Sequence, residues 1–137
     1  MPSIKNFTVF GDRVDVFVDS ATSNGHSSTF VEEVKPGGGP PPHSHTKEDE
    51  TFVALDGGFE LLLNGTWSPL VAGEAAFAPR GSIHTFRNSG KTAARLLIVV
   101  TPGGFEEYLE QIGPLSPARD LGKIIEISNR HGITFHL

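Results

Sequence analysis

The chain of 137 residues has the length and composition of one ordinary globular domain. Its 11 Lys and Arg residues against 16 Asp and Glu residues give a net charge of -5, which disfavours a nucleic-acid-binding surface. The absence of cysteine excludes disulfides and thiolate ligands, so a transition metal would depend on histidine and carboxylate side chains. Because no apolar run reaches membrane length and no signal-peptide pattern is present, we expect a cytoplasmic protein without a membrane partner.

The N-terminal part of the sequence predicts an arm and two strands. Residues 1–11 form the arm, which ends in a short apolar run. From Arg13 to Asp19 apolar and polar residues alternate, with Val14 and Val16 on one face, as in a half-buried strand. Residues 28–35 alternate in the same way and predict a second strand.

Short extended segments separated by turn residues fill the middle of the chain. Strands are predicted over residues 50–55, 59–63, 66–70, 75–78, 83–87 and 93–101. Asn64-Gly65 indicates a hairpin, and Pro69 places the returning strand near a sheet edge. Strands repeating about every 8–12 residues predict a sandwich or a barrel.

After residue 102 the apolar period changes from that of strands to that of helices. Apolar residues at positions 105, 108, 109 and 112 fall on one helical face. Gly113 ends this helix, and Ser116-Pro117 begins another that Gly132 ends before an apolar tail. We expect the helices to pack against the outside of the barrel or against a second subunit.

Four side chains that can bind a metal lie in two stretches rich in glycine and proline. His43 and His45 are two residues apart on an extended segment and therefore point to the same side. Glu50 follows a short polar segment, and His84 belongs to another predicted strand. Three imidazoles and one carboxylate suit Mn, Fe, Co, Ni, Cu or Zn rather than Mg or Ca. An octahedral ion held in this way would keep positions open for water, oxygen or substrate.

The spacing of these residues resembles the two-part signature of the cupin superfamily. The first part, Gly-x5-His-x-His-x4-Glu-x6-Gly, matches residues 37–57 at every position. The second part, Gly-x5-Pro-x-Gly-x2-His-x3-Asn, matches residues 73–88 at every position. Within the acidic run of Glu48, Asp49 and Glu50, the resemblance selects Glu50 as the ligand.

The resemblance implies an all-β fold, a double-stranded β-helix or jelly-roll barrel, with short C-terminal helices. We expect one cupin domain over residues 1–137, with a barrel core at about 12–102 and a helical segment at about 104–131. A homodimer is also expected. The resemblance further implies one divalent transition-metal ion, Fe, Mn, Ni, Cu, Co or Zn, held by His43, His45, Glu50 and His84.

Aromatic residues near the ligands predict an apolar substrate pocket. The candidates for its wall are Phe52, Phe59, Phe77 and Phe86. Phe86 shares the inward face of its strand with His84, and Phe52 shares that of Glu50, whereas the sequence leaves the facing of the other two open. An aromatic wall favours a small hydrophobic or aromatic molecule as the partner.

Within the superfamily, the chain looks similar to single-domain relatives of quercetin dioxygenase, which implies an oxidoreductase. The metal would orient an enolate or phenolate and O2 for ring or C–C cleavage, and Glu50 would be both ligand and catalytic proton acceptor. Two alternatives stay open. A metal-dependent isomerase or lyase would need no oxygen, and a metal-dependent binding module would hold its small molecule without turnover.

Overall fold

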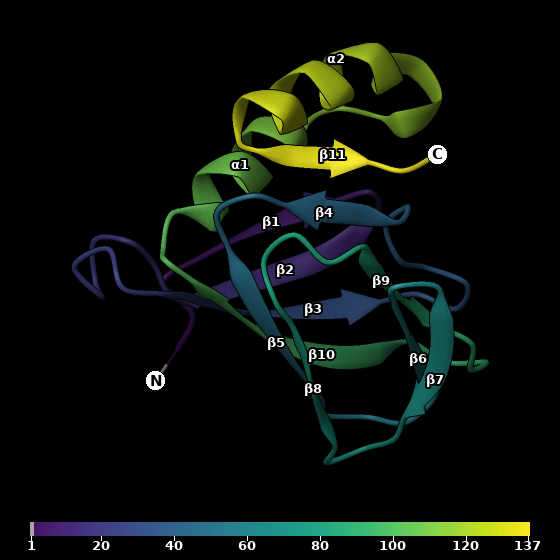
Figure 1. The fold of residues 1–137 in the computed structure, drawn as a ribbon. Helices are drawn as coiled ribbons and strands as arrows, with labels where there is room; N and C mark the ends of the chain where they lie inside the picture. Colours follow the sequence, from purple (N-terminus) through teal and green to yellow (C-terminus); the bar gives the residue numbers. More distant parts are fainter. Residues whose placement is uncertain (1) are drawn as a thin grey trace.

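The computed structural model describes residues 2–137, in which two antiparallel β-sheets face each other (Figure 1). The first sheet has the strand order β1 (Lys5–Val9), β2 (Asp12–Val18), β3 (Ser28–Val34), β10 (Ala94–Thr101), β5 (Asp49–Ala54) and β8 (Ala75–Ala78). The second has the order β11 (Ile133–Phe135), β4 (His43–His45), β9 (His84–Asn88), β6 (Phe59–Leu63) and β7 (Thr66–Leu70). The predicted all-β barrel is therefore confirmed.

The strand alternation read from the sequence places the core between the sheets. In β2, Val14 and Val16 are buried while Arg13 is exposed, and β10 buries alternate residues along its whole length. The hairpin between β6 and β7 turns at Asn64 and Gly65, whose φ angles of 47° and 90° suit a tight two-residue turn. Strand β7, which contains Pro69, forms a sheet edge as predicted.

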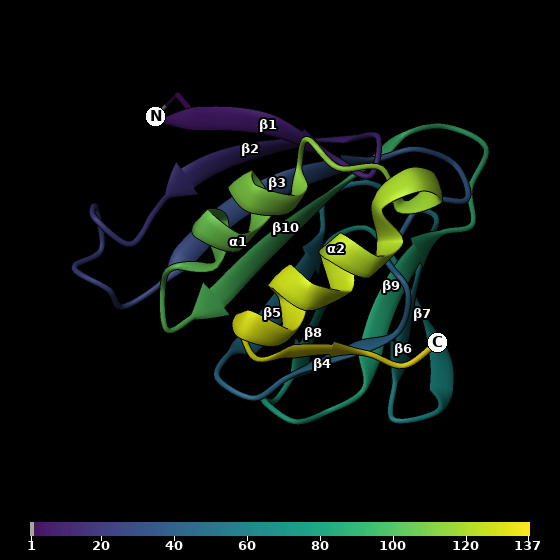
Figure 2. The same ribbon diagram turned by 90° about the horizontal axis from the view of Figure 1, so that it is seen from above.

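Both predicted helices are present and lie with β11 across one side of the barrel (Figure 2). They are α1 (Phe105–Ile112) and α2 (Pro117–Arg130). At the start of α2, Asp120 accepts a hydrogen bond from the backbone N–H of Ser116 at 3.0 Å. Between the helices, the hydroxyls of Tyr108 and Ser128 lie 2.7 Å apart. The helices thus pack on the barrel of their own chain, the first of the two arrangements expected.

None of the helices in residues 2–137 is long and apolar enough to cross a membrane.

Two strands of the structure fall in segments that the sequence left as an arm and a tail. Strand β1, which lies within the arm, pairs with β2. Strand β11 pairs with β4 along the tail, with Ile133 opposite His45 and Phe135 opposite His43. Just beyond it, His136 Nε2 lies 3.0 Å from Ser44 Oγ. Strand β11 therefore covers the edge of the short strand that carries two of the candidate ligands.

We predict that Asn88→Ala lowers the free energy of unfolding by roughly 3 kcal/mol, because three buried or partly buried hydrogen bonds to the backbone are lost. The side-chain amide of Asn88 donates to the carbonyls of Val34 and Thr92 at 3.0 and 2.8 Å and accepts from the Gly90 N–H at 2.9 Å. Urea denaturation measures the change. Asn129→Ala, at an exposed site of α2, is the control and should stay within about 0.5 kcal/mol of wild type. Equal effects of the two variants would contradict this role of Asn88.

Candidate metal centre

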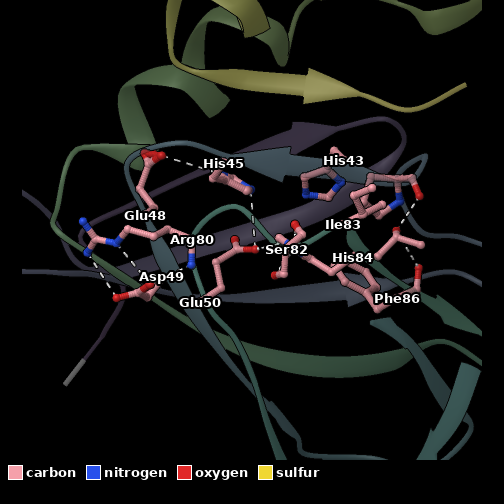
Figure 3. Close-up of polar contacts among 12 residues, drawn as sticks. His43, His45, Glu48, Asp49, Glu50, Arg80, Ser82, Ile83, His84 and Phe86 are labelled. Carbon is pink, nitrogen blue, oxygen red and sulfur yellow. Dashed lines mark hydrogen bonds and ion pairs between the residues drawn. The ribbon is translucent and has the colours of Figure 1, made fainter. Parts of the chain in front are cut away.

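Four side chains converge on one point inside the barrel (Figure 3). They are His43 and His45 from β4, Glu50 from β5 and His84 from β9, and they are called the His/Glu cluster below. One potential ligand atom from each residue lies within 4.8 Å of those of the other three. The convergence predicted from the sequence is therefore present.

The sheet register explains how distant residues meet. In the second sheet His43 is directly opposite His84, which places both on the same inward face. Both histidines of β4 are buried, while the intervening Ser44 is only half-buried, as the period of two requires. Glu50 comes from the facing sheet, where it pairs with Val100 in the buried row of β10. The cluster thus bridges the two sheets.

The three residues of the acidic run Glu48, Asp49 and Glu50, at the start of β5, have different contacts, as Figure 3 shows. The carboxylate of Asp49 faces outward and pairs with the guanidinium of Arg80 at 3.1 Å. Glu48 lies beside His45, with its Oε1 3.4 Å from the Nδ1 atom. Among the three acidic residues, Glu50 alone belongs to the cluster, as the spacing of the signature predicts.

Neighbouring oxygens orient the imidazoles so that Nε2 faces the centre. His43 Nδ1 lies 2.8 Å from the carbonyl oxygen of Pro41, and His84 Nδ1 lies 3.1 Å from that of Ser82. A carbonyl oxygen accepts a hydrogen bond, so these contacts favour a proton on Nδ1 and leave a lone pair on Nε2. Such second contacts are typical of histidines that bind metals.

The atoms at the centre need a shared cation. His84 Nε2 lies 2.5 Å from Glu50 Oε2, and His45 Nε2 lies 3.5 Å from the same oxygen. With its proton on Nδ1, His84 directs a lone pair at a carboxylate, and a proton or a metal ion between them must relieve the repulsion. Both ring nitrogens of His45 are buried without a hydrogen bond from the described residues. The cluster therefore fits a metal ion, and its donor set suits a divalent transition metal.

The electrostatics of the cluster favour the metal-binding forms of Glu50 and His43. Burial would raise the pKa of Glu50, but the close contact with His84 and the neighbouring imidazoles lower it to about 2. Burial lowers the pKa of His43 to about 4. At His45 burial is outweighed by the carboxylates of Glu48 and Glu50, which raise its pKa. At neutral pH the cluster thus offers an ionised carboxylate and a neutral imidazole at His43.

A cavity of about 210 Å³ opens beside the cluster. Its wall is largely aromatic and aliphatic and includes Phe30, Phe52, Phe86, Phe105 and Phe135. Helix α1 and strand β11 close this space from the side opposite the barrel strands. A small apolar molecule in the cavity would lie against three of the four cluster residues, His43, His45 and Glu50.

Two of the four predicted pocket residues, Phe52 and Phe86, line the cavity. Phe59 instead lies in the core behind Phe86, with ring centroids 6.4 Å apart, and does not reach the cavity. The prediction for Phe77 is wrong, because this side chain is 54% exposed. Its register partner is Thr51, which alternates with the inward residues of β5, so Phe77 shares the outward face.

The sequence analysis missed cavity residues that lie outside the two-part signature. Phe105 and Tyr108 come from α1, and Phe135 comes from the unpredicted strand β11. Glu32 lines the cavity from β3, between the buried residues Phe30 and Val34 of the same face. The alternation in residues 28–34 could have predicted this position, because Glu32 is two residues from Phe30 and therefore lies on the same face of the strand.

Comparison with known proteins agrees with this geometry. The family model described as "Cupin domain" matches residues 30–100, a span that contains the whole cluster. The chain belongs to the cupin family. As a cupin fold, the structure is similar to an RmlC-like cupin from Shewanella frigidimarina, with a TM-score of 0.65 and 16% identity over 75% of this chain and 87% of that one.

The names of other similar proteins describe different activities. Protein SchB of Streptomyces halstedii is 32% identical over 75% of this chain and 67% of its own length. Endoribonuclease YbeY of Myxococcus xanthus is 26% identical over 91% of this chain but 42% of its own length. The chain thus spans less than half of the first two curated relatives it matches. A structure of oxalate oxidase with the substrate analogue glycolate has a TM-score of 0.58 and 28% identity, over 70% of this chain and 55% of that one.

We predict that His43→Ala and His84→Ala each reduce bound transition metal from about one ion per chain to near zero while the barrel stays folded. Elemental analysis of protein purified without a histidine tag measures the metal, and circular dichroism monitors the fold. His26→Ala, in an exposed turn, is the matched control and should keep its metal. Full metal content in both cluster variants would contradict the assignment of the site.

Proposed function

We propose that this cupin binds one divalent transition-metal ion, Fe, Mn, Ni, Cu, Co or Zn, at the His/Glu cluster and is a dioxygenase-like oxidoreductase related to quercetin dioxygenases. Its substrate would be a small hydrophobic or aromatic molecule. The observation that carries the proposal is the opening of the cluster into a cavity with a largely aromatic and aliphatic wall. When bound, the ion would supply the Lewis acidity that holds an enolate or phenolate in reach of O2.

Each residue of the site has a part in this chemistry. The contacts of Glu50 to His45 and His84 both use Oε2, so we assign Oε1 as the acceptor of the substrate proton. The rings of Phe52 and Phe86 would hold the apolar body of the substrate and keep bulk water from the reacting atoms. The carbonyls of Pro41 and Ser82 keep the imidazoles in place during the reaction.

The size and charge of the cavity narrow the substrate class. A cavity of about 150 Å³ holds benzene, so about 210 Å³ suits one substituted ring or two fused rings. In the described chain, Lys35 is the one Lys or Arg residue that lines the cavity, and its ammonium lies 3.5 Å from Asp12 Oδ1. A small dianion such as oxalate therefore fits this site less well than a phenol or a β-diketone.

We predict that the metal-loaded protein consumes oxygen when given a small phenol or a β-diketone, and that His84→Ala abolishes the uptake. An oxygen electrode measures the rate, and His26→Ala should match wild type. Product formation without oxygen uptake would replace the proposal with an isomerase or lyase. Tight binding without any product would replace it with a binding module.

We also predict that Phe86→Leu weakens binding of an aromatic ligand about five- to tenfold, because the cavity loses a ring contact. Phe77→Leu is the matched control, since its side chain is exposed on the outer face, and it should bind as wild type does. Calorimetric titration with the ligand compares the three proteins. Equal losses in both variants would remove the cavity as the binding site.

Three sequence-based expectations stay predictions: a homodimer, a cytoplasmic location, and a small molecule rather than nucleic acid or a membrane as the partner. The homodimer rests on the cupin resemblance and on the apolar C-terminal elements. A sedimentation mass of one chain at micromolar concentration would contradict it.

A further inference from the structure

Away from the His/Glu cluster, the cavity wall carries a second carboxyl group, that of Glu32 in β3. The buried residues on either side of it along this face of the strand are Phe30 and Val34, so the side chain points to the interior of the barrel. Its register partner in β10 is Leu96, which is fully buried. Glu32 is half-buried because it borders the cavity, and the opposite face of β3 carries the exposed Glu33.

Beside Glu32 lies the carboxyl group of Asp12, which is 4% exposed and begins β2. Asp12 Oδ1 accepts hydrogen bonds from the backbone N–H of Lys35 at 3.2 Å and from its ammonium at 3.5 Å. These contacts stabilise a negative charge on Asp12. Of the two neighbouring carboxyl groups, Asp12 is therefore the one that lies against the Lys35 ammonium.

Glu32 has no cation within ion-pair distance in residues 2–137, because the ammonium of Lys35 is paired with Asp12. The other ionisable groups on the cavity wall are Glu50, His43, His45 and Tyr108. Burial, the charge of Asp12 and that of Glu50 raise the pKa of Glu32 well above its ordinary value of 4.5, and Lys35 opposes this only in part. Two adjacent carboxyl groups with one cation hold one proton between them, and here it stays on Glu32.

We propose that Glu32 carries a proton inside the cavity and donates a hydrogen bond from its carboxyl group to the polar end of a substrate whose other end lies at the His/Glu cluster. The contact between Glu32 and substrate rests on the proposed function, whereas the proton on Glu32 does not. This contact specifies the substrate class further: an apolar body with an anionic oxygen at one end and a hydrogen-bond acceptor, such as a carbonyl, at the other.

The proton on Glu32 is tested by infrared spectroscopy, because a protonated carboxylic acid absorbs apart from carboxylates. At neutral pH, wild type and Glu33→Gln should show the acid band, and Glu32→Gln should lack it. Glu33 is the matched control, since it is the exposed neighbour on the outer face of the same strand. Absence of the band in wild type, or its persistence in Glu32→Gln, would overturn the assignment.

The same proton predicts a pH-dependent stability difference. A group whose pKa is raised on folding stabilises the native state below its unfolded value and loses that contribution as pH rises through the folded value. Relative to wild type, Glu32→Gln should therefore become more stable as pH rises from about 5 to about 8. Glu33→Gln should follow wild type across this range. A stability difference for Glu32→Gln that does not change with pH would contradict the inference.

The contact to substrate is tested with two phenols of matched shape, 4-hydroxyacetophenone and 4-isopropylphenol. Only the first has a carbonyl acceptor opposite its phenol oxygen. Metal-loaded wild type should prefer it about five- to tenfold, Glu32→Leu should lose the preference, and Glu32→Gln should retain part of it through its amide N–H. If wild type bound the two phenols with equal affinity, or bound neither, the proposed substrate contact would be overturned. Failure to load metal would refute the proposed function instead, and the infrared result would still decide where the proton lies.

Discussion

The structure depends on one buried negative charge. The Glu50 carboxylate is 4% exposed within a barrel whose interior is otherwise largely apolar, and a buried anion needs compensation. The three imidazoles provide it, and the close approach of His84 Nε2 to Glu50 Oε2 at 2.5 Å calls for a proton or a metal ion between the two atoms. Without this negative charge, the three histidines buried between the two sheets would have no anionic partner.

The remaining elements place this charge at the wall of the cavity. Strand β11 completes the sheet beside the short strand β4, and α1 contributes Phe105 and Tyr108 to the cavity wall. The C-terminal segment therefore shapes the site although it carries none of the cluster residues. Glu32 is opposite Leu96 and Glu50 is opposite Val100 along β10, so the two carboxyl groups enter the cavity wall from different positions, and this asymmetry would orient a molecule with two different ends.

The sequence could predict the cluster because fixed spacing along short strands determines which side chains share a face. The same reasoning placed Phe52 and Phe86 correctly, since each shares a strand with a ligand. It could not place Phe77, because the facing of β8 depends on its register with β5, a long-range pairing that local alternation does not define. Strand β11 was missed for a similar reason, because three residues become a strand only through pairing with β4. The alternation in β3 puts Glu32 on the face of Phe30 and Val34, but the sequence analysis drew no site prediction from it.

The most direct test of the central claim is the position of a bound metal ion in crystals grown from metal-loaded protein. Anomalous diffraction at the absorption edge of the metal should give one peak per chain, at about 2.0–2.2 Å from the three Nε2 atoms and a Glu50 oxygen. A peak elsewhere, or a peak that touches two or fewer of these side chains, would contradict the account.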